Sequence, residues 1–201
     1  MPIVFIYIYN WPSTKSWTYD GETHTDEVYT VTYDGAAATA DKSGKVFTLS
    51  TGDTVTITAT AEGVKDYDAS YSENNTYTYA ISNAGSYSNV TATTGTLSID
   101  KAAVTLTSEG GEKPYDGTPL TKPEVTVGGN GADVFKTEVS GITATGSVTT
   151  VAEGEVTNTI TYTAGEAFKA ENYTITKDEG KLKITESQKA LVIEMYPLCS
   201  A

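Results

Sequence analysis

The sequence predicts an all-β protein of two tandem domains, most simply two immunoglobulin-like β-sandwiches, with β-grasp-like repeats as the alternative. Three observations lead to this prediction. The chain holds 36 Thr, 14 Tyr and 18 Gly but only 2 Met and 4 Phe, a composition that suits pleated, half-buried strands. Short alternating runs are separated by Gly, Asn and Asp, as antiparallel hairpins require. Several motifs also occur twice, in the same order.

The repeated motifs define two copies of one domain. Tyr19-Asp20-Gly21 returns as Tyr115-Asp116-Gly117. The stretch 75–79 (NTYTY) returns as 158–162 (NTITY), and 95–99 (GTLSI) returns as 180–184 (GKLKI). A repeat of this length makes each copy a domain of its own, not a short unit of a solenoid.

In the first copy the alternation predicts strands over 28–33, 53–60, 76–81, 90–94 and 96–99. Within 53–60, Val55 and Ile57 share one face because successive side chains of a strand point to opposite sides. The apolar run 3–9 predicts a buried first strand, since it is too short to span a bilayer and lacks the features of a signal peptide. No segment shows sustained helical periodicity, although 36–41 is compatible with one helical turn.

The second copy is expected to form strands over 104–107, 125–127, 142–145, 159–162, 173–176 and 182–184. The domains are therefore predicted over 1–100 and 101–186. No Pro/Ser-rich linker separates them, which predicts a semi-rigid rod. The tail 187–201 contains Leu191-Val192-Ile193, which we interpret as the first strand of a truncated third repeat.

The segment 115–185 carries six short motifs whose order is more informative than any one of them. They are YDG-x-x-L (115–120), EVTV (124–127), ITATGS (142–147), NTITY (158–162), ENYTIT (171–176) and GKLKIT (180–185). This segment resembles the YDG/MBG-type tandem β repeats of large surface proteins and adhesins of Gram-positive bacteria. The resemblance covers residues 17–186 and is looser in the first copy, where His24 stands in place of Leu120. It implies an extracellular, all-β, non-enzymatic module, and it transfers no binding residues.

Charge and composition exclude several classes of partner. The net charge is −13, and all 13 basic residues are Lys. An acidic chain repels polyanions, and without Arg it lacks the guanidinium fork that binds phosphate or guanine through two hydrogen bonds. We therefore expect no nucleic-acid partner. No direct membrane insertion is expected either, because the apolar run 3–9 is too short to span a bilayer. Cys199 is the only cysteine, so no intrachain disulfide is possible.

The sequence indicates no enzyme, cofactor or metal site. His24 is the only histidine, and no Gly-x-Ser-x-Gly nucleophile elbow occurs. The acidic stretch 66–73 lacks the Gly and final Glu of an EF-hand and is interpreted as a solvated loop. The run 128–131 (GGNG) lacks the Lys-Ser/Thr pair of a phosphate loop and is interpreted as a flexible turn. Catalytic, cofactor-binding and metal residues are all expected to be absent.

Two sets of residues remain as candidates. Asp20-Gly21 and Asp116-Gly117 are expected to form equivalent structural turns, with both glycines at positive φ. Tyr67, Tyr71 and Tyr77 are candidate glycan contacts, because tyrosines cluster there and the second copy keeps fewer of them.

The function we expect is that of a non-enzymatic stalk or spacer repeat in a bacterial cell-surface adhesin-like protein. Its partners would be neighbouring repeats of the same protein. The expected location is extracellular, at the cell surface or cell wall, with the signal and anchor outside this sequence. The alternative is an adhesion module that binds a host glycan or surface protein through exposed Tyr residues. Symmetry between the copies would favour the spacer, and exposed aromatic residues in only one copy would favour binding.

Overall fold

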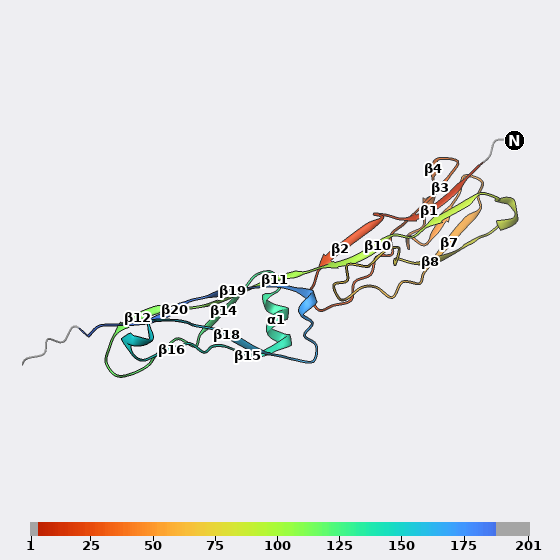
Figure 1. Ribbon diagram of the computed structural model, residues 1–201. Coiled ribbons are helices and arrows are strands. Elements are labelled where there is room, and N and C mark those ends of the chain that lie inside the picture. Colours follow the sequence, from red (N-terminus) through yellow and green to blue (C-terminus); the bar gives the residue numbers. More distant parts are fainter. Residues whose placement is uncertain (1–3, 188–201) are drawn as a thin grey trace, which may run out of the picture. The chain divides into compact units, whose positions relative to one another are not determined.

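The computed structural model describes residues 4–187 (Figure 1), so the tail strand expected at 191–193 lies outside the described residues. The protein is all-β, with 49% of residues in strands and 9% in helices. Its contacts divide it into two units. Unit 1 comprises residues up to 102 together with 169–174, and unit 2 comprises residues 103–168 and those from 175 onward.

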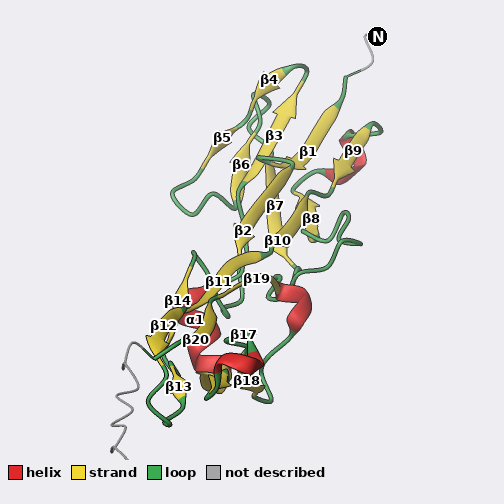
Figure 2. Cartoon of the chain, turned by 60° about the vertical axis from the view of Figure 1, so that its left-hand side comes forward, coloured by secondary structure: helices red, strands yellow, loops and turns green. Residues whose placement is uncertain are grey.

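Unit 1 contains two four-stranded sheets and one two-stranded sheet (Figure 2). The first sheet has the order β4 (Ala36–Ala37), β3 (Tyr29–Tyr33), β1 (Ile6–Asn10), β9 (Val90–Thr93). The second has the order β5 (Thr39–Ala40), β6 (Val46–Thr48), β7 (Thr54–Ala59), β8 (Tyr77–Ile81). The third pairs β2 (Thr14–Thr18) with β10 (Thr96–Asp100), and a 3-10 turn, η1, covers Ala84–Ser86.

The core of unit 1 lies between its two four-stranded sheets. Strands β1 and β3 contribute Ile6, Ile8, Tyr29 and Val31, while β6, β7 and the residue after β6 contribute Phe47, Leu49, Val55 and Ile57. These side chains alternate with exposed ones, as the sequence predicts for 53–60. Because one buried cluster draws on both sheets, the sheets pack face to face.

Unit 2 is built from four small sheets. Their orders are β14 (Val125–Gly128), β11 (Ala102–Ser108), β19 (Tyr173–Glu179); then β12 (Gly111–Pro114), β20 (Lys181–Thr185), β17 (Glu155–Thr157); then β13 (Leu120–Thr121), β16 (Ser147–Val148); and β15 (Val139–Ala144), β18 (Ile160–Ala164). The 3-10 turn η2 covers Val151–Glu153, and η3, Ala170–Asn172, belongs to unit 1.

The structure corrects two expectations about helices. Helix α1, Ala132–Glu138, directly follows the glycine run 128–131, in a region where the sequence shows no sustained helical periodicity. Its seven residues are too short to show periodicity, and its formation depends on Phe135, which is fully buried against the rings of Tyr162 and Phe168. Conversely, 36–41 holds β4 and β5 instead of a helical turn, because Thr39 and Ala40 pair with β6.

The two units share a set of strand pairings. Strands β1, β2, β3, β9 and β10 of unit 1 correspond to β11, β12, β14, β19 and β20 of unit 2. In each unit the first strand pairs antiparallel with a later one, β1 with β3 and β11 with β14. In each unit the second strand also pairs parallel with the last, β2 with β10 and β12 with β20. Strand β1 is in addition parallel to β9.

The repeated motifs meet where these strand pairs pass from one sheet to the next, a place that we call the crossing of each unit. The N–H of Asn75 donates to the carbonyl of Gly95 at 3.0 Å, and the N–H of Asn158 donates to that of Gly180 at 2.8 Å. A Cβ on Gly95 would lie 2.8 Å from the carbonyl oxygen of Ser13, and one on Gly180 would lie 2.2 Å from the nitrogen of Gly110. Both positions therefore require glycine because another backbone segment approaches closely.

Candidate functional site

The Asp-Gly turns have the same geometry in both copies. Gly21 and Gly117 each have a φ of 83°. The side chain of Asp20 accepts the N–H of Glu22 at 2.9 Å, and that of Asp116 accepts the N–H of Thr118 at 2.9 Å. The carboxylate thus bonds the backbone two residues on, which closes the turn.

Hydrogen bonds to these two carboxylates lower their pKa values. The N–H and hydroxyl of Thr118, followed by Lys113, lower the pKa of Asp116 to about 2. The N–H of Glu22, followed by His24, lowers the pKa of Asp20. Each carboxylate is therefore held ionised by the turn that it closes, which is a structural role.

His24 takes part in packing at the same end of unit 1. Its Nε2 lies 3.0 Å from the carboxylate of Asp20, and its ring stacks on Trp17 with centroids 4.9 Å apart. Its backbone forms an isolated antiparallel bridge with Val64. Leu120, which the sequence aligns with His24, packs instead against the small apolar cluster of Val148, Leu182 and Ile184. Within residues 4–187, no three His, Cys, Asp or Glu side chains are placed to hold a metal ion.

The acidic stretch 66–73 uses its aspartate carboxylates in contacts within unit 1. Within unit 1, Asp66 accepts a hydrogen bond from the side-chain amide of Asn172 at 2.8 Å and pairs with Lys169. Asp68 accepts the N–H of Ser70 at 2.8 Å and its hydroxyl at 2.6 Å. Both Asp carboxylates are therefore occupied by protein donors.

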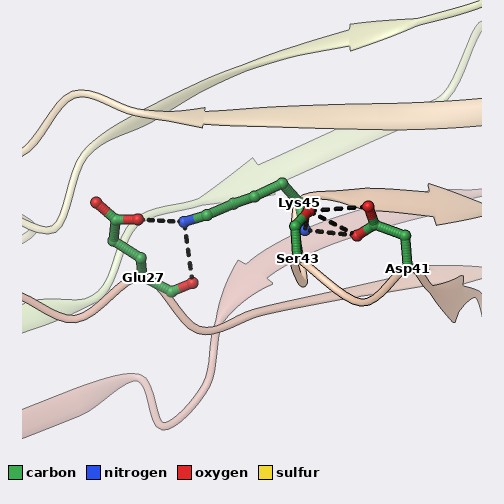
Figure 3. Close-up of polar contacts among 4 residues, drawn as sticks. All are labelled: Glu27, Asp41, Ser43 and Lys45. Atoms are coloured by element: carbon green, nitrogen blue, oxygen red, sulfur yellow. Dashed lines mark hydrogen bonds and ion pairs between the residues drawn. The ribbon is translucent and has the colours of Figure 1, made fainter.

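A group of Asp, Ser, Lys and Glu side chains in unit 1 contains residue types that catalysis uses (Figure 3). The hydroxyl of Ser43 donates to the carboxylate of Asp41 at 2.8 Å, and the N–H groups of Lys45 and Val46 donate to the same carboxylate at 3.2 Å. The ammonium of Lys45 points away from Ser43 and pairs with Glu27. The Asp41 carboxylate thus accepts one hydroxyl and two backbone N–H groups of the following residues, and these hydrogen bonds close the loop between β5 and β6.

The candidate glycan residues Tyr67, Tyr71 and Tyr77 are each half-buried. Tyr77 packs against the core, and its hydroxyl lies 2.8 Å from the carbonyl of Ile8 and 2.9 Å from that of Thr93, to which it donates. Burial raises the pKa of Tyr77 to about 12. The ring of Tyr67 is covered by the ammonium of Lys101 at 4.6 Å. The hydroxyl of Tyr77 and one face of the Tyr67 ring are thus already engaged.

The structure exposes aromatic rings on β1 and just before it, at Phe5, where the sequence predicts a buried strand. Ile6 and Ile8 are buried, but Phe5 and Tyr7 are 39% and 42% exposed, and Tyr9 is half-exposed. A strand does form, over Ile6–Asn10, but the expectation that it is buried holds for only one of its faces. The sequence signal for this was the alternation of Ile with aromatic residues, which indicates a strand with two different faces. Treating all these residues simply as apolar hides that alternation.

Threonines flank the rings of Tyr7 and Tyr9 on both sides. Tyr7 pairs with Thr32 of β3 and Thr91 of β9, and Tyr9 pairs with Thr30 of β3 and Thr93 of β9. Directly paired residues of neighbouring strands lie on the same face of a sheet. We call this surface the aromatic face and define it by Phe5, Tyr7, Tyr9, Thr30, Thr32, Thr91 and Thr93.

Comparison with known proteins adds no relative. No protein-family model matches the chain, and searches of curated proteins and of solved structures find no significant similarity. Among the described residues, no helix is long and apolar enough to cross a membrane.

Proposed function

We propose that this chain is a stalk or spacer repeat that carries tension in a bacterial cell-surface, adhesin-like protein, located outside the cell and adjoining further repeats of its own kind. The proposal assigns it no catalytic activity, cofactor or metal. The repeated strand pairing supports this, because tandem domains that share one architecture are suited to setting distance. Strand β10 ends at Asp100 and β11 begins at Ala102, so only Lys101 separates the last strand of the first repeat from the first strand of the second.

The observation that carries the proposal is the parallel pairing of early and late strands. Strand β2 is parallel to β10 over five residue pairs, from Thr14 with Thr96 to Thr18 with Asp100. Tension applied at the two ends of the repeat pulls these neighbours in opposite directions. The evenly spaced hydrogen bonds of a parallel pair are then loaded together in shear, instead of breaking one after another.

The second repeat has the same arrangement. Strand β12 is parallel to β20, from Gly111 with Leu182 to Pro114 with Thr185. Both repeats would therefore resist extension by the same mechanism. We propose further that unit 1 is an immunoglobulin-like sandwich, because its two four-stranded sheets pack face to face around one core.

Single-molecule force spectroscopy tests the spacer role. In one geometry the full chain is pulled through its two ends. In the other, β2 and β10 are pulled through Cys handles at Ser13 and Thr94 in a Cys199→Ser background, so that force is applied at the same end of both strands. We expect unit 1 to yield at a several-fold higher force in the first geometry, because shear loads all the bonds at once. Equal forces in both geometries would contradict the proposal.

A further inference from the structure

The outer surface of β1 carries more aromatic area than the fold requires. Hydrogen bonds at the strand crossing fix the correspondence between the units, since the N–H of Gly95 donates to the side chain of Asn10 and that of Gly180 donates to the side chain of Ser108. By this correspondence Phe5, Tyr7 and Tyr9 match Ala103, Thr105 and Thr107 of β11. Unit 2 therefore forms the same pairings with small side chains at these positions, of which Ala103 and Thr105 are exposed.

Exposed aromatic residues that folding does not need call for another explanation. A contiguous exposed apolar patch marks a binding surface more often than chance. Because the rings occur in only one unit, the spacer role, which both units would share, does not explain them. The aromatic face is therefore the strongest indication of binding among the described residues.

The chemistry of the aromatic face narrows the ligand. Its seven side chains are aromatic or hydroxylated, and none is charged. The chain as a whole carries −13, so an anionic ligand would be repelled and would find no cation on this face. A neutral sugar ring matches it, because a pyranose presents C–H groups on its faces, which pack on aromatic rings, and hydroxyls at its edges, which hydrogen-bond to threonine.

The geometry favours a linear ligand. The rings of Phe5 and Tyr7 are nearly parallel, at 25°, with centroids 5.8 Å apart. Tyr9 continues the row, since alternate side chains of a strand follow one another every 7 Å or so. Rows of Thr hydroxyls run beside the rings on both neighbouring strands. The face is therefore a narrow stripe, whereas a folded protein partner would commonly cover about 800 Å².

We propose that the aromatic face of unit 1 binds a neutral, linear polysaccharide lying along β1. The Phe5, Tyr7 and Tyr9 rings pack against the faces of successive sugar residues. Thr30 and Thr32 on one side, and Thr91 and Thr93 on the other, exchange hydrogen bonds with their hydroxyls. This role is additional to the spacer function and independent of it.

Unit 2 supplies the variant that tests this proposal. The triple substitution Phe5→Ala, Tyr7→Thr, Tyr9→Thr installs the side chains that β11 carries at the corresponding positions, so the fold tolerates them in the same setting. The control is Tyr79→Thr, which removes a ring that is 40% exposed on β8 of the same unit. Thermal unfolding followed by circular dichroism verifies that each variant is folded.

Binding of the full chain is measured by co-sedimentation with insoluble cellulose, chitin and mannan, and by affinity electrophoresis in xyloglucan, with alginate as the anionic comparison. We expect binding to at least one neutral polysaccharide, none to alginate, a loss of at least tenfold in the triple variant, and no change in Tyr79→Thr.

Three results would overturn the proposal. They are no binding to any neutral polysaccharide tested, unchanged binding by the folded triple variant, and concentration-dependent self-association that the triple variant abolishes while no polysaccharide binds. The last result would identify the aromatic face as a contact between copies of this chain. None of them alters the force measurement, so failure here is distinguishable from failure of the spacer proposal.

Discussion

The crossings of unit 1 and unit 2 both bring a glycine close to another backbone segment, but different polar side chains hydrogen-bond around it. In unit 1 the N–H of Gly95 donates to the side chain of Asn10 at 2.7 Å, and Asn74 exchanges two hydrogen bonds with the backbone of Leu97. In unit 2 the buried Asn158 donates to the carbonyls of Glu109 and Lys122 and accepts the N–H of Gly146. The glycine is common to both crossings, whereas the polar side chains around it have changed.

The first strands of the two units, β1 and β11, also differ on their outer surfaces. Strand β1 carries aromatic residues at positions where β11 carries small ones, although Ile8 and Leu106 are both fully buried in their own units. The comparison separates positions that the fold fixes from positions that it leaves free. Positions inside the crossing are constrained by backbone contact, and positions on the outer face are available for binding.

The largest effect should come from adding a methyl group at the crossing of unit 2. In Gly180→Ala the Cβ would meet the backbone of Gly110 and Glu109, neither of which can rotate away. We expect a loss of about 3 kcal/mol or more in the free energy of unfolding of unit 2, the upper range for overpacking. Gly95→Ala, whose nearest contact is longer at 2.8 Å, should cost unit 1 less.

Urea unfolding separates these two effects. Trp fluorescence follows unit 1, because the 2 Trp residues lie there, and hydrogen exchange of β20 follows unit 2. Equal losses in the two variants would show that the crossings do not differ in tightness.

The second effect concerns the buried amides. Asn158→Ala removes three hydrogen bonds and leaves one backbone N–H and two carbonyls without this partner. We expect a loss of about 2–3 kcal/mol in the free energy of unfolding of unit 2, measured by urea unfolding.

Asn10→Ser introduces the residue type of Ser108 in unit 1 and removes a buried amide nitrogen that has no partner among the described residues. It should change the free energy of unfolding of unit 1 by less than about 1 kcal/mol. A larger loss would mean that Ser cannot replace Asn10 in the way that Ser108 serves unit 2.

A smaller effect is expected at the Asp-Gly turns. Gly117→Ala meets no atom within 4 Å, so its cost comes from the positive φ alone, about 1 kcal/mol. Gly21→Ala should cost unit 1 a similar amount. Gly85→Ala, which also meets open space but lacks a φ in the left-handed region, is the control and should be neutral. Thermal unfolding of the three variants measures the difference, and a Gly117→Ala variant as stable as Gly85→Ala would contradict the argument.

The smallest effect concerns acid stability. The pKa of Asp116 is lowered to about 2 in the folded protein, so its contribution is complete above the ordinary Asp pKa and is lost as the pH falls toward about 2. Asp116→Asn should therefore weaken the pH dependence of the urea midpoint of unit 2 between about pH 4 and pH 2. Asp133→Asn, at a fully exposed carboxylate, is the control. An unchanged pH profile in Asp116→Asn would contradict the assignment.

Local pattern in the sequence predicted the all-β class, most of the strands and the conformation of the Asp-Gly turns. Each of these depends on neighbours a few residues apart, as with Val55 and Ile57 on one face of β7 or Asp116 closing its own turn. The repeat of Asn75 and Gly95 as Asn158 and Gly180 was equally visible. Its meaning was not, because no local rule states that these residues bond each other.

Tertiary structure decided which strands pair and which faces remain open. Strand β1 pairs with β9, far along the chain, and a shift of one residue would have buried Tyr7 and Tyr9 in place of Ile6 and Ile8. The short helix α1 likewise exists because Phe135 finds an aromatic pocket, not because its own seven residues favour it. Pairing partners and packing contacts are set by the free energy of the whole core. Local periodicity limits those contacts but does not specify them.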